Sequence, residues 1–339
     1  MTDIVPTPAD LRFGSDAEPG IRRRGTSRFT YVDERTGRPP AERHLERIRA
    51  LAVPPAWTDV WISADPTSHV QATGRDARGR KQYRYHPEFT RARSDGKFAD
   101  LVAFGAQLGR LRRRVRRDLA SHELTHAQVV AVVVRLLDMT GMRVGNERYA
   151  RDNRSFGLTT LRDRHVVVRG STINLSFRGK AAHEFDISVD SPRLARIVRA
   201  CRELPGRQLF QYFAPDGELR TLTSTDVNGY LSEHGGVSMT AKSFRTWNAT
   251  VLATSGLARA AEDGAARSAG VVCEVIDQVA DQLGNTRSVC RTSYVHPGVV
   301  DAFLGGTLLP SWRRPVGDRP AGLTVDERRV LRLLRKQAR

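Results

Sequence analysis

The chain has 339 residues, with 55 Lys and Arg against 37 Asp and Glu, so its formal net charge is +18. Only five of these cations are lysines, and the others are arginines. A content of 40% hydrophobic and 27% charged residues is typical of a folded protein rather than a disordered one. The charge indicates a polyanionic partner, most often nucleic acid.

Several classes of protein are excluded by the same inventory. No apolar run approaches the roughly 18 residues that a membrane span needs, and residues 1–10 lack the pattern of a signal peptide. The three cysteines are odd in number and lack CxxC spacing, which suits a reducing compartment. We therefore expect a cytoplasmic, nucleoid-associated protein with no membrane partner.

The N-terminal part of the chain is predicted to be rich in strands. Residues 1–25 carry Pro, Gly and charge and end in three arginines, so we expect a flexible basic arm. From 26 to 90 the period-two pattern predicts strands at 28–33, 59–64, 69–73 and 80–86, with one helix at 41–51. This predicts a small domain dominated by an antiparallel sheet.

Helical periodicity dominates residues 91–310. Leu108, Leu111, Val115 and Leu119 form one apolar stripe. Further helices are predicted at 129–137, 192–203, 224–233, 241–260 and 271–283, and three short strands at 165–189 form an insert. Residues 311–339 are predicted to be a tail with a short basic helix, opened by a capping box. The fold class is α+β.

One motif suggests a metal site that we do not predict. Residues 122–126 read HELTH, which matches the HExxH pattern of zinc proteases. However, Thr125 and Gln128 form a capping box, so a helix is expected to begin between the two histidines, and no third ligand follows. The prediction is a surface turn without a metal.

Residues 71–86 are predicted to form a basic, aromatic hairpin. Tyrosines contact sugars and bases while cations pair with phosphates, so such a hairpin suits a DNA groove. A charged edge strand that resists aggregation is the alternative. The candidate DNA-contacting residues here are Arg75, Arg78, Arg80, Lys81, Tyr83, Arg84 and Tyr85.

The chemistry of phosphodiester cleavage singles out one lysine. A side chain that cleaves DNA needs a nucleophile, cations that bind the phosphate oxygens, and an acid for the departing 5′ oxygen. Arginine suits the second role and lysine suits the third. In this arginine-rich chain, Lys180 stands in a predicted β turn, FRGK, so it is the candidate acid.

At this point the sequence resembles the small type IB DNA topoisomerases of poxviruses and bacteria. The resemblance runs from about residue 20 to residue 305, in the order of the family. The matching segments are PPAWTDVW (54–61), QATGRDARGRKQYRYH (71–86), RVGNERYARDNRSFGLTTLRDRHV (143–166), FRGK (177–180), AKSFRTW (241–247) and LGNTRSVCRTSYVHP (283–297).

The resemblance implies a role for individual residues. Tyr294 would be the nucleophile that forms a covalent 3′-phosphotyrosyl bond, Arg143 and Arg245 would bind the non-bridging oxygens, and Lys180 would protonate the 5′ oxygen. Residues alone favour blander readings, because a tyrosine with a pKa of about 10 is a poor nucleophile without nearby cations. On that alternative, Tyr294 is a core tyrosine, Arg143 and Arg245 are surface arginines, and Lys180 is a solvated lysine in a turn.

Other positions follow from the same resemblance. Asn285 stands where poxvirus enzymes carry a catalytic histidine, and it can donate a hydrogen bond but cannot carry charge. A capping role after Gly284 is compatible with this. Tyr149 matches a phosphate-contacting tyrosine, and Lys242 is a further candidate DNA contact. The scheme requires no metal, no ATP and no other cofactor.

The implied protein is a monomeric clamp around duplex DNA, with a DNA-binding domain at 26–90 and a catalytic domain at 91–310. Two alternatives remain. A tyrosine recombinase uses related chemistry, but recombinases usually carry His-x-x-Arg where this chain has KSFR at 242–245. A non-catalytic DNA-binding protein would keep the charge, although it would not need to keep Arg143, Lys180, Arg245 and Tyr294.

Overall fold

The structure is a computed structural model that describes residues 10–26, 28–236 and 239–337. The chain divides into two compact units, residues 1–98 and 99–339. The boundary between them lies inside one long helix, α2 (Pro87–Asp118), as does the domain boundary that we predicted after residue 90. Each unit is described by itself.

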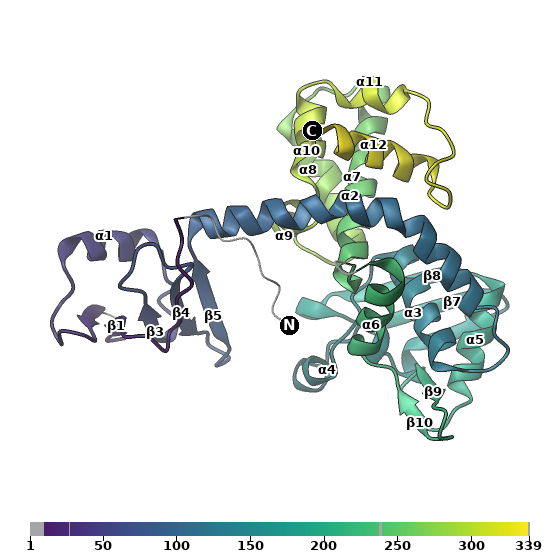
Figure 1. Cartoon of the computed structure of the whole chain (residues 1–339), viewed down its shortest axis with the longest axis horizontal. Coiled ribbons are helices and arrows are strands. Elements are labelled where there is room, and N and C mark those ends of the chain that lie inside the picture. The colour runs from purple at the N-terminus through teal and green to yellow at the C-terminus, as the bar shows by residue number, and fades with distance from the viewer. Residues whose placement is uncertain (1–9, 27, 237–238, 338–339) are drawn as a thin grey trace. The chain divides into compact units, whose positions relative to one another are not determined.

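The first unit is built on a five-stranded antiparallel sheet with strand order β2-β1-β3-β4-β5. The sheet and its helix are drawn in Figure 1. Ile21, Val60, Ile62 and Ala72 of the sheet and Ile48 of the helix form the buried core. The predicted β-rich character and the hairpin are confirmed. The elements are β1 (Ile21–Arg24), β2 (Thr30–Asp33), α1 (Glu42–Ala50), β3 (Thr58–Ile62), β4 (Val70–Arg75) and β5 (Lys81–Tyr85).

The prediction of a flexible arm over residues 1–25 is wrong for part of its length. Residues 1–9 lie outside the described residues, but Ile21–Arg24 form β1, which pairs with both β2 and β3. Two of the three arginines have partners beyond the segment itself: Arg22 pairs with Glu34 at 2.8 Å, and the Arg23 guanidinium lies 4.2 Å from the Phe29 ring centroid. With these contacts, the charged segment Ile21–Arg24 forms a strand that lies between β2 and β3 in the sheet.

The second unit is mainly helical and contains two small sheets. One is the predicted three-stranded insert, with order β6-β7-β8, and the other is a β9–β10 hairpin that the sequence did not predict. Its helices and strands are α3 (His126–Thr140), α4 (Glu147–Asn153), β6 (Val166–Arg169), β7 (Thr172–Arg178), β8 (Glu184–Asp190), α5 (Pro192–Arg202), β9 (Gln211–Phe213), β10 (Leu219–Thr221), α6 (Ser224–Gly235), α7 (Ala241–Glu262), α8 (Ala269–Leu283), α9 (Arg287–Ser293), α10 (Pro297–Leu304), α11 (Leu308–Arg313) and α12 (Val325–Gln337).

Helix α7 is the centre of this unit. It packs against α3, α8, α10, α11 and α12, and its Phe244 and Trp247 side chains are fully buried. The predicted apolar stripe is also buried: Leu108, Leu111 and Val115 lie on α2, and Leu119 directly follows it. Burial of these large side chains supplies most of the driving force for packing, at about 25 cal/mol per Å² of apolar surface.

The predicted tail at 311–339 is instead part of the core of the second unit. Val330, Leu331 and Leu334 of α12 are buried, and the predicted capping box is present: the Thr324 N–H donates to the Glu327 carboxylate at 2.7 Å, and the Glu327 N–H donates to Thr324 Oγ1 at 3.2 Å. Because one face of α12 is apolar, this helix packs into the core although its composition is basic.

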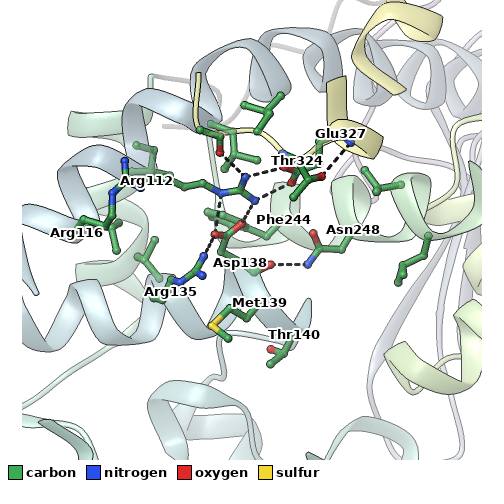
Figure 2. Close-up of a pocket in the computed structure, with 18 of the residues that line it drawn as sticks. Arg112, Arg116, Arg135, Asp138, Met139, Thr140, Phe244, Asn248, Thr324 and Glu327 are labelled. Carbon is green, nitrogen blue, oxygen red and sulfur yellow. Dashed lines mark hydrogen bonds and ion pairs between the residues drawn. The ribbon is translucent and has the colours of Figure 1, made fainter. Parts of the chain in front are cut away.

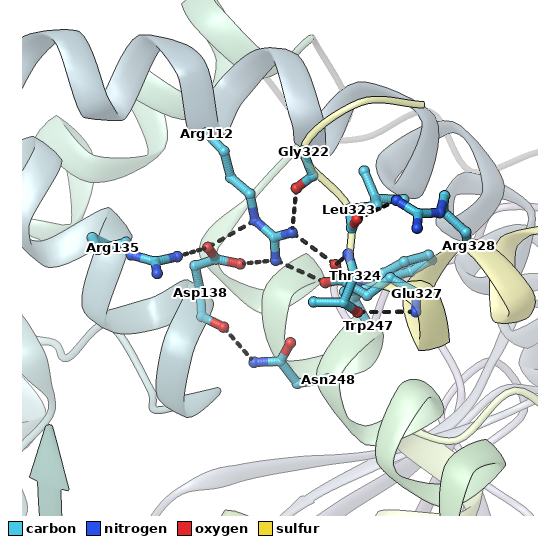
Figure 3. Close-up of polar contacts among 10 residues, drawn as sticks. All are labelled: Arg112, Arg135, Asp138, Trp247, Asn248, Gly322, Leu323, Thr324, Glu327 and Arg328. Carbon is cyan, nitrogen blue, oxygen red and sulfur yellow. Dashed lines mark hydrogen bonds and ion pairs between the residues drawn. The ribbon is translucent and has the colours of Figure 1, made fainter. Parts of the chain in front are cut away.

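A buried ionic cluster joins α12 to the other helices (Figure 2). Arg112 of α2 donates to both Asp138 oxygens at 2.9 and 2.7 Å and to both Glu327 oxygens at 2.7 Å. Arg135 also binds Asp138, and Trp247 Nε1 donates to Glu327 at 3.1 Å (Figure 3). Burial lowers the pKa of Arg112, but its bonds to Glu327 and Asp138 outweigh burial and raise it. The cluster thus links α2, α3, α7 and α12.

No described helix combines the length and the apolar character needed to span a membrane.

Candidate active site

Arg245 is held by the ends of two helices. It lies on the first turns of α7 and is 2% exposed. Its Nη1 donates to the Gly141 carbonyl at 2.8 Å, and its Nη2 donates to the Leu283 carbonyl. These carbonyls belong to the C-terminal ends of α3 and α8, where the helix dipole is negative. Burial and the charge of Arg143 lower the pKa of Arg245, against the opposing effect of Tyr294.

Arg143 and Asn285 meet because two helices end in left-handed glycines. Gly141 caps α3 at φ 62° and Gly284 caps α8 at φ 58°, a conformation that glycine adopts without strain. The chain leaves each helix toward the other, and Arg143 Nη2 donates to Asn285 Oδ1 at 2.8 Å. The capping role expected for Asn285 is wrong, because Thr286 is the N-cap of α9 and its side chain accepts from the Val289 N–H at 3.3 Å. Asn285 instead lies beside an arginine that is 142 residues away along the chain.

Tyr294 lies at the C-terminal cap of α9. Its ring centroid lies 5.0 Å from the guanidinium carbon of Arg245, and its side chain is half-buried. Cys290, one turn earlier, is fully buried, and burial raises the pKa of its thiol to about 11. The structure thus brings four of the predicted catalytic residues together: Arg143, Arg245, Asn285 and Tyr294.

Three buried N–H groups of these residues have no hydrogen-bond partner within the described chain. They are Arg143 Nη1, Arg245 Nε and Asn285 Nδ2. Buried donors are nearly always paired in folded proteins, so three orphans on neighbouring side chains call for an explanation. All three are donors and two carry positive charge, which is the chemistry that binds the oxygens of a phosphate.

Lys180 lies on a loop that packs against the same site. It begins a single 3-10 turn between β7 and β8, in which Ala181 and Ala182 both have positive φ. A Cβ added at Gly284 would meet His183 of this loop and Phe185 of β8, each at 2.5 Å. The loop therefore contacts the residue before Asn285. The Lys180 side chain is exposed, and within the described structure no hydrogen bond or ion pair joins it to the four clustered residues.

Tyr149 lies on the short helix α4, which follows Arg143 in the chain. Its N–H donates to the side chain of Asn146, the N-cap of that helix, at 3.0 Å. The Arg143 carbonyl accepts from the Leu158 N–H at 3.0 Å, and a Cβ at Gly157 would meet Gly145 at 2.6 Å. The close backbone approach fixes the segment that carries Arg143. Tyr149 itself is half-exposed.

The two histidines of the HELTH segment do not share a helical turn. Thr125 caps α3, accepting from the Gln128 N–H at 3.3 Å, and the helix begins at His126, as the capping box predicted. His126 Nε2 lies 3.3 Å from Asp226 Oδ1. No group of three or more His, Cys, Asp or Glu side chains in the described residues is arranged to hold a metal.

The basic hairpin of the first unit presents its predicted aromatic side. The Tyr83 and Tyr85 rings are exposed and stacked, with centroids 5.8 Å apart, and the Lys81 amine lies 5.5 Å from the Tyr83 centroid. Lys81 also pairs with Asp16 at 2.6 Å. Acidic partners therefore hold several of the cations: Arg75 with Asp59, Arg80 with Asp76, and Lys81 with Asp16. Arg84 donates to the Ala52 carbonyl, and Arg78 and Lys242 are exposed.

Sequence reasoning missed the groups that hold the site together. The carbonyls of Gly141 and Leu283, which accept from Arg245, carry no side-chain signal. A glycine after a helical run is a recognisable end signal, and Gly141 follows α3 in this way. Thr250, which bonds to the backbone beside Tyr294, was also not singled out.

The fold is that of a two-unit α+β protein, and its candidate site places two arginines and an asparagine beside a tyrosine. A family model described as "Eukaryotic DNA topoisomerase I, catalytic core" matches residues 86–303, and a model described as "Bacterial DNA topoisomerase IB, N-terminal domain" matches residues 28–76. The chain belongs to the type IB DNA topoisomerase family, as the resemblance predicted. It is an enzyme of that type.

Individual relatives agree with this assignment. DNA topoisomerase 1B of Acanthamoeba polyphaga mimivirus is 29% identical over 282 residues, which cover 81% of this chain and 84% of the relative. DNA topoisomerase 1B of Vaccinia virus is 23% identical over 146 residues, covering 41% and 46%. The solved XerH site-specific recombinase has a TM-score of 0.34 at 13% identity, over 55% of this chain and 49% of that one. That likeness is too low to support an argument.

Proposed function

We propose that this enzyme relaxes supercoiled duplex DNA through a transient single-strand break in which Tyr294 carries the DNA 3′ end. The observation that carries the proposal is the set of three buried, unpartnered donors on Arg143, Arg245 and Asn285 beside that tyrosine. Such donors stabilise the charge that develops on a phosphate in the transition state, each typically by about 3–4 kcal/mol.

In the cleavage step, the phenolic oxygen of Tyr294 bonds to phosphorus and the bond from phosphorus to the 5′ oxygen breaks. The net proton movement is from the phenol to the 5′ oxygen, and we assign Lys180 as the acid that delivers it. Arg143 and Arg245 bind the non-bridging oxygens, while Asn285 adds a neutral donor. Religation is the reverse step, in which the 5′ hydroxyl attacks the phosphotyrosine.

The bond energy of the broken strand is retained in the phosphotyrosyl link. The proposed cycle therefore consumes no ATP, and its acid and phosphate-binding roles are given to side chains. Between cleavage and religation the duplex rotates and supercoils are lost. The enzyme would act as a monomer that holds the duplex as a clamp, with the hairpin unit (26–90) binding DNA and the helical unit (91–310) performing the chemistry.

Hairpin contacts would be mainly electrostatic. The exposed Arg78 and Lys81, with the stacked Tyr83 and Tyr85, suit a groove in which cations meet phosphates and rings meet sugars or bases. We also assign Arg75, Arg80, Arg84, Tyr149 and Lys242 to DNA contact. Arg75 and Arg80 would exchange their partners, Asp59 and Asp76, for phosphates when DNA binds.

The test is relaxation of a negatively supercoiled plasmid in EDTA without ATP. Relaxation by the wild type and its loss in Tyr294→Phe support the proposal, with Tyr212→Phe as the matched control, because Tyr212 lies outside the site against His126. Absence of both relaxation and a denaturant-stable protein–DNA adduct would refute it. Recombination between two marked DNA sites would favour the recombinase alternative.

A further inference from the structure

Thr250 contacts the backbone on both sides of the proposed nucleophile. This residue lies on α7, five residues after Arg245, and is completely buried. Its Oγ1 donates to the Tyr294 carbonyl at 3.1 Å and accepts from the His296 N–H at 3.2 Å. One hydroxyl therefore pairs with two backbone groups that bracket Val295.

These two backbone groups depend on a partner from outside their own helices. Helix α9 ends at Ser293, and Tyr294 adopts a non-helical cap conformation with φ −134° and ψ −26°. Helix α10 begins at Pro297, with His296 as its N-cap. Carbonyls after a helix end and N–H groups before a helix start lack partners in the helical ladder. Backbone groups of this kind are nearly always paired, and in this partly buried place Thr250 pairs with both.

The local helix fixes Tyr294 only from one side. The Tyr294 N–H and the Val295 N–H both donate to the Cys290 carbonyl, at 3.0 and 3.1 Å. Those bonds leave the direction of the following peptide to be set elsewhere. Thr250 sets it from α7, the helix that also carries Arg245, whose guanidinium carbon lies 5.0 Å from the Tyr294 ring centroid.

We propose that Thr250 is a positioning residue that holds Tyr294 in register with Arg245 for attack on the phosphate. The proposal rests on the function assigned above to Tyr294. In-line attack needs the nucleophile within a few tenths of an ångström of its productive position, and a displacement of 1 Å can cost about 100-fold in rate. The hydroxyl of Thr250 ties the backbone of the nucleophile to the helix that carries a phosphate-binding arginine.

The chain offers a matched control on the same helix. Thr254 lies one turn after Thr250 and is also completely buried, but its hydroxyl donates to the Thr250 carbonyl at 2.6 Å, within α7. Thr254→Val and Thr250→Val therefore remove the same hydroxyl from equally buried places. Only Thr250→Val removes the hydrogen bonds to the Tyr294 carbonyl and the His296 N–H.

The experiment measures single-turnover cleavage of a short duplex whose 5′-hydroxyl fragment dissociates, so that covalent adduct accumulates. DNA affinity and melting temperature are measured for each variant. We expect Thr250→Val to cleave roughly 10- to 100-fold more slowly, with DNA affinity unchanged within about twofold. Thr254→Val should cleave near the wild-type rate, and Thr250→Ser, which keeps the hydroxyl, should restore cleavage to within about threefold of wild type.

The inference is wrong if Thr250→Val cleaves at the same rate as Thr254→Val, whether both keep the wild-type rate or both lose it equally. If Thr250→Val does not fold, Thr250→Cys decides the matter, since a thiol is a weak hydrogen-bonding group. An intermediate rate supports positioning, and a wild-type rate refutes it. Tyr294→Phe is run alongside: adduct formation by that variant contradicts the proposed function, whereas an inactive Tyr294→Phe with normal Thr250→Val contradicts only the role of Thr250.

Discussion

The buried cluster around Arg112 makes a quantitative prediction about stability. We expect Arg112→Met to leave two carboxylates, Asp138 and Glu327, without their shared cation, and their side chains are only 4% and 7% exposed. Asp138 would keep its bond from Arg135, and Glu327 would keep Trp247 Nε1 (Figure 3). The substitution replaces a charged side chain with one of similar length, so the loss of charge dominates over a loss of volume.

Removing one partner of a buried ion pair typically costs about 3–5 kcal/mol. For a unit of roughly this size, each kcal/mol lowers the melting temperature by about 2–4 °C, so a decrease of about 6–20 °C is expected. Arg116→Met is the control, because Arg116 is exposed one turn further along the same helix. An exposed substitution of this kind should change the free energy of unfolding by less than about 0.5 kcal/mol.

The pH dependence of stability tests the contribution of Glu327 separately. Burial raises the pKa of Glu327, but the hydrogen bonds and charge of Arg112 outweigh it, and the pKa lies below its ordinary value of 4.5. A lowered pKa stabilises the folded state above that ordinary value, and this contribution is lost as the pH falls through the lowered one. Arg112→Met lacks this contribution of Glu327 to stability. The melting temperatures of the wild type and of Arg112→Met should therefore converge as the pH falls below about 4.5.

Thermal unfolding monitored by circular dichroism at pH 7.5 and at several values below pH 5 makes the comparison. Equal melting temperatures for Arg112→Met and Arg116→Met at pH 7.5 would show that the cluster contributes nothing net. A gap that stays constant through the acidic range would show that the carboxylate of Glu327 is not its source.

Three further predictions concern the site, the hairpin and the cysteines. Arg143→Ala and Arg245→Ala should each slow cleavage by about 10²- to 10³-fold in a single-turnover assay, while DNA binding measured by gel shift persists. Arg78→Ala should weaken DNA binding and reduce the slope of log affinity against log salt by about 0.9, if that side chain contacts one phosphate; an unchanged slope would remove it from the interface. Cys290 should resist iodoacetamide at pH 8 in the folded enzyme because burial raises its pKa, whereas the partly exposed Cys273 should react first; the labelled peptides identify the order.

The sequence predicted those parts of the fold whose signals are local. The period-two hairpin at β4 and β5, the apolar stripe of α2 and the caps at Thr125 and Thr324 all depend on residues close together in the chain. The strand β1 was missed because its composition reads as a charged run. Its assignment depends on Glu34 and Phe29 and on pairing with β3, none of which is visible in the segment itself.

The site shows a similar division. Family resemblance gave roles to Tyr294, Arg143, Arg245 and Asn285, and the structure places these side chains together. No sequence pattern could show that Arg143 would bind Asn285, since that contact requires two helices, α3 and α8, to end side by side. The backbone carbonyls that hold Arg245 have no residue-type signal at all. Lys180 was found from its rarity among arginines, and its placement depends on how the β7–β8 loop packs against Gly284.

The central claim is that Tyr294, among the seven tyrosines of the chain, bonds to the DNA. Covalent adduct trapped with denaturant can be digested with nuclease and trypsin, and the modified peptide can be sequenced by mass spectrometry. Tryptic cleavage after Arg291 and Arg313 yields residues 292–313, which contain no tyrosine besides Tyr294. The account predicts a nucleotide attached through its 3′ phosphate to that peptide. Attachment to any other peptide, or through a 5′ phosphate, would contradict it.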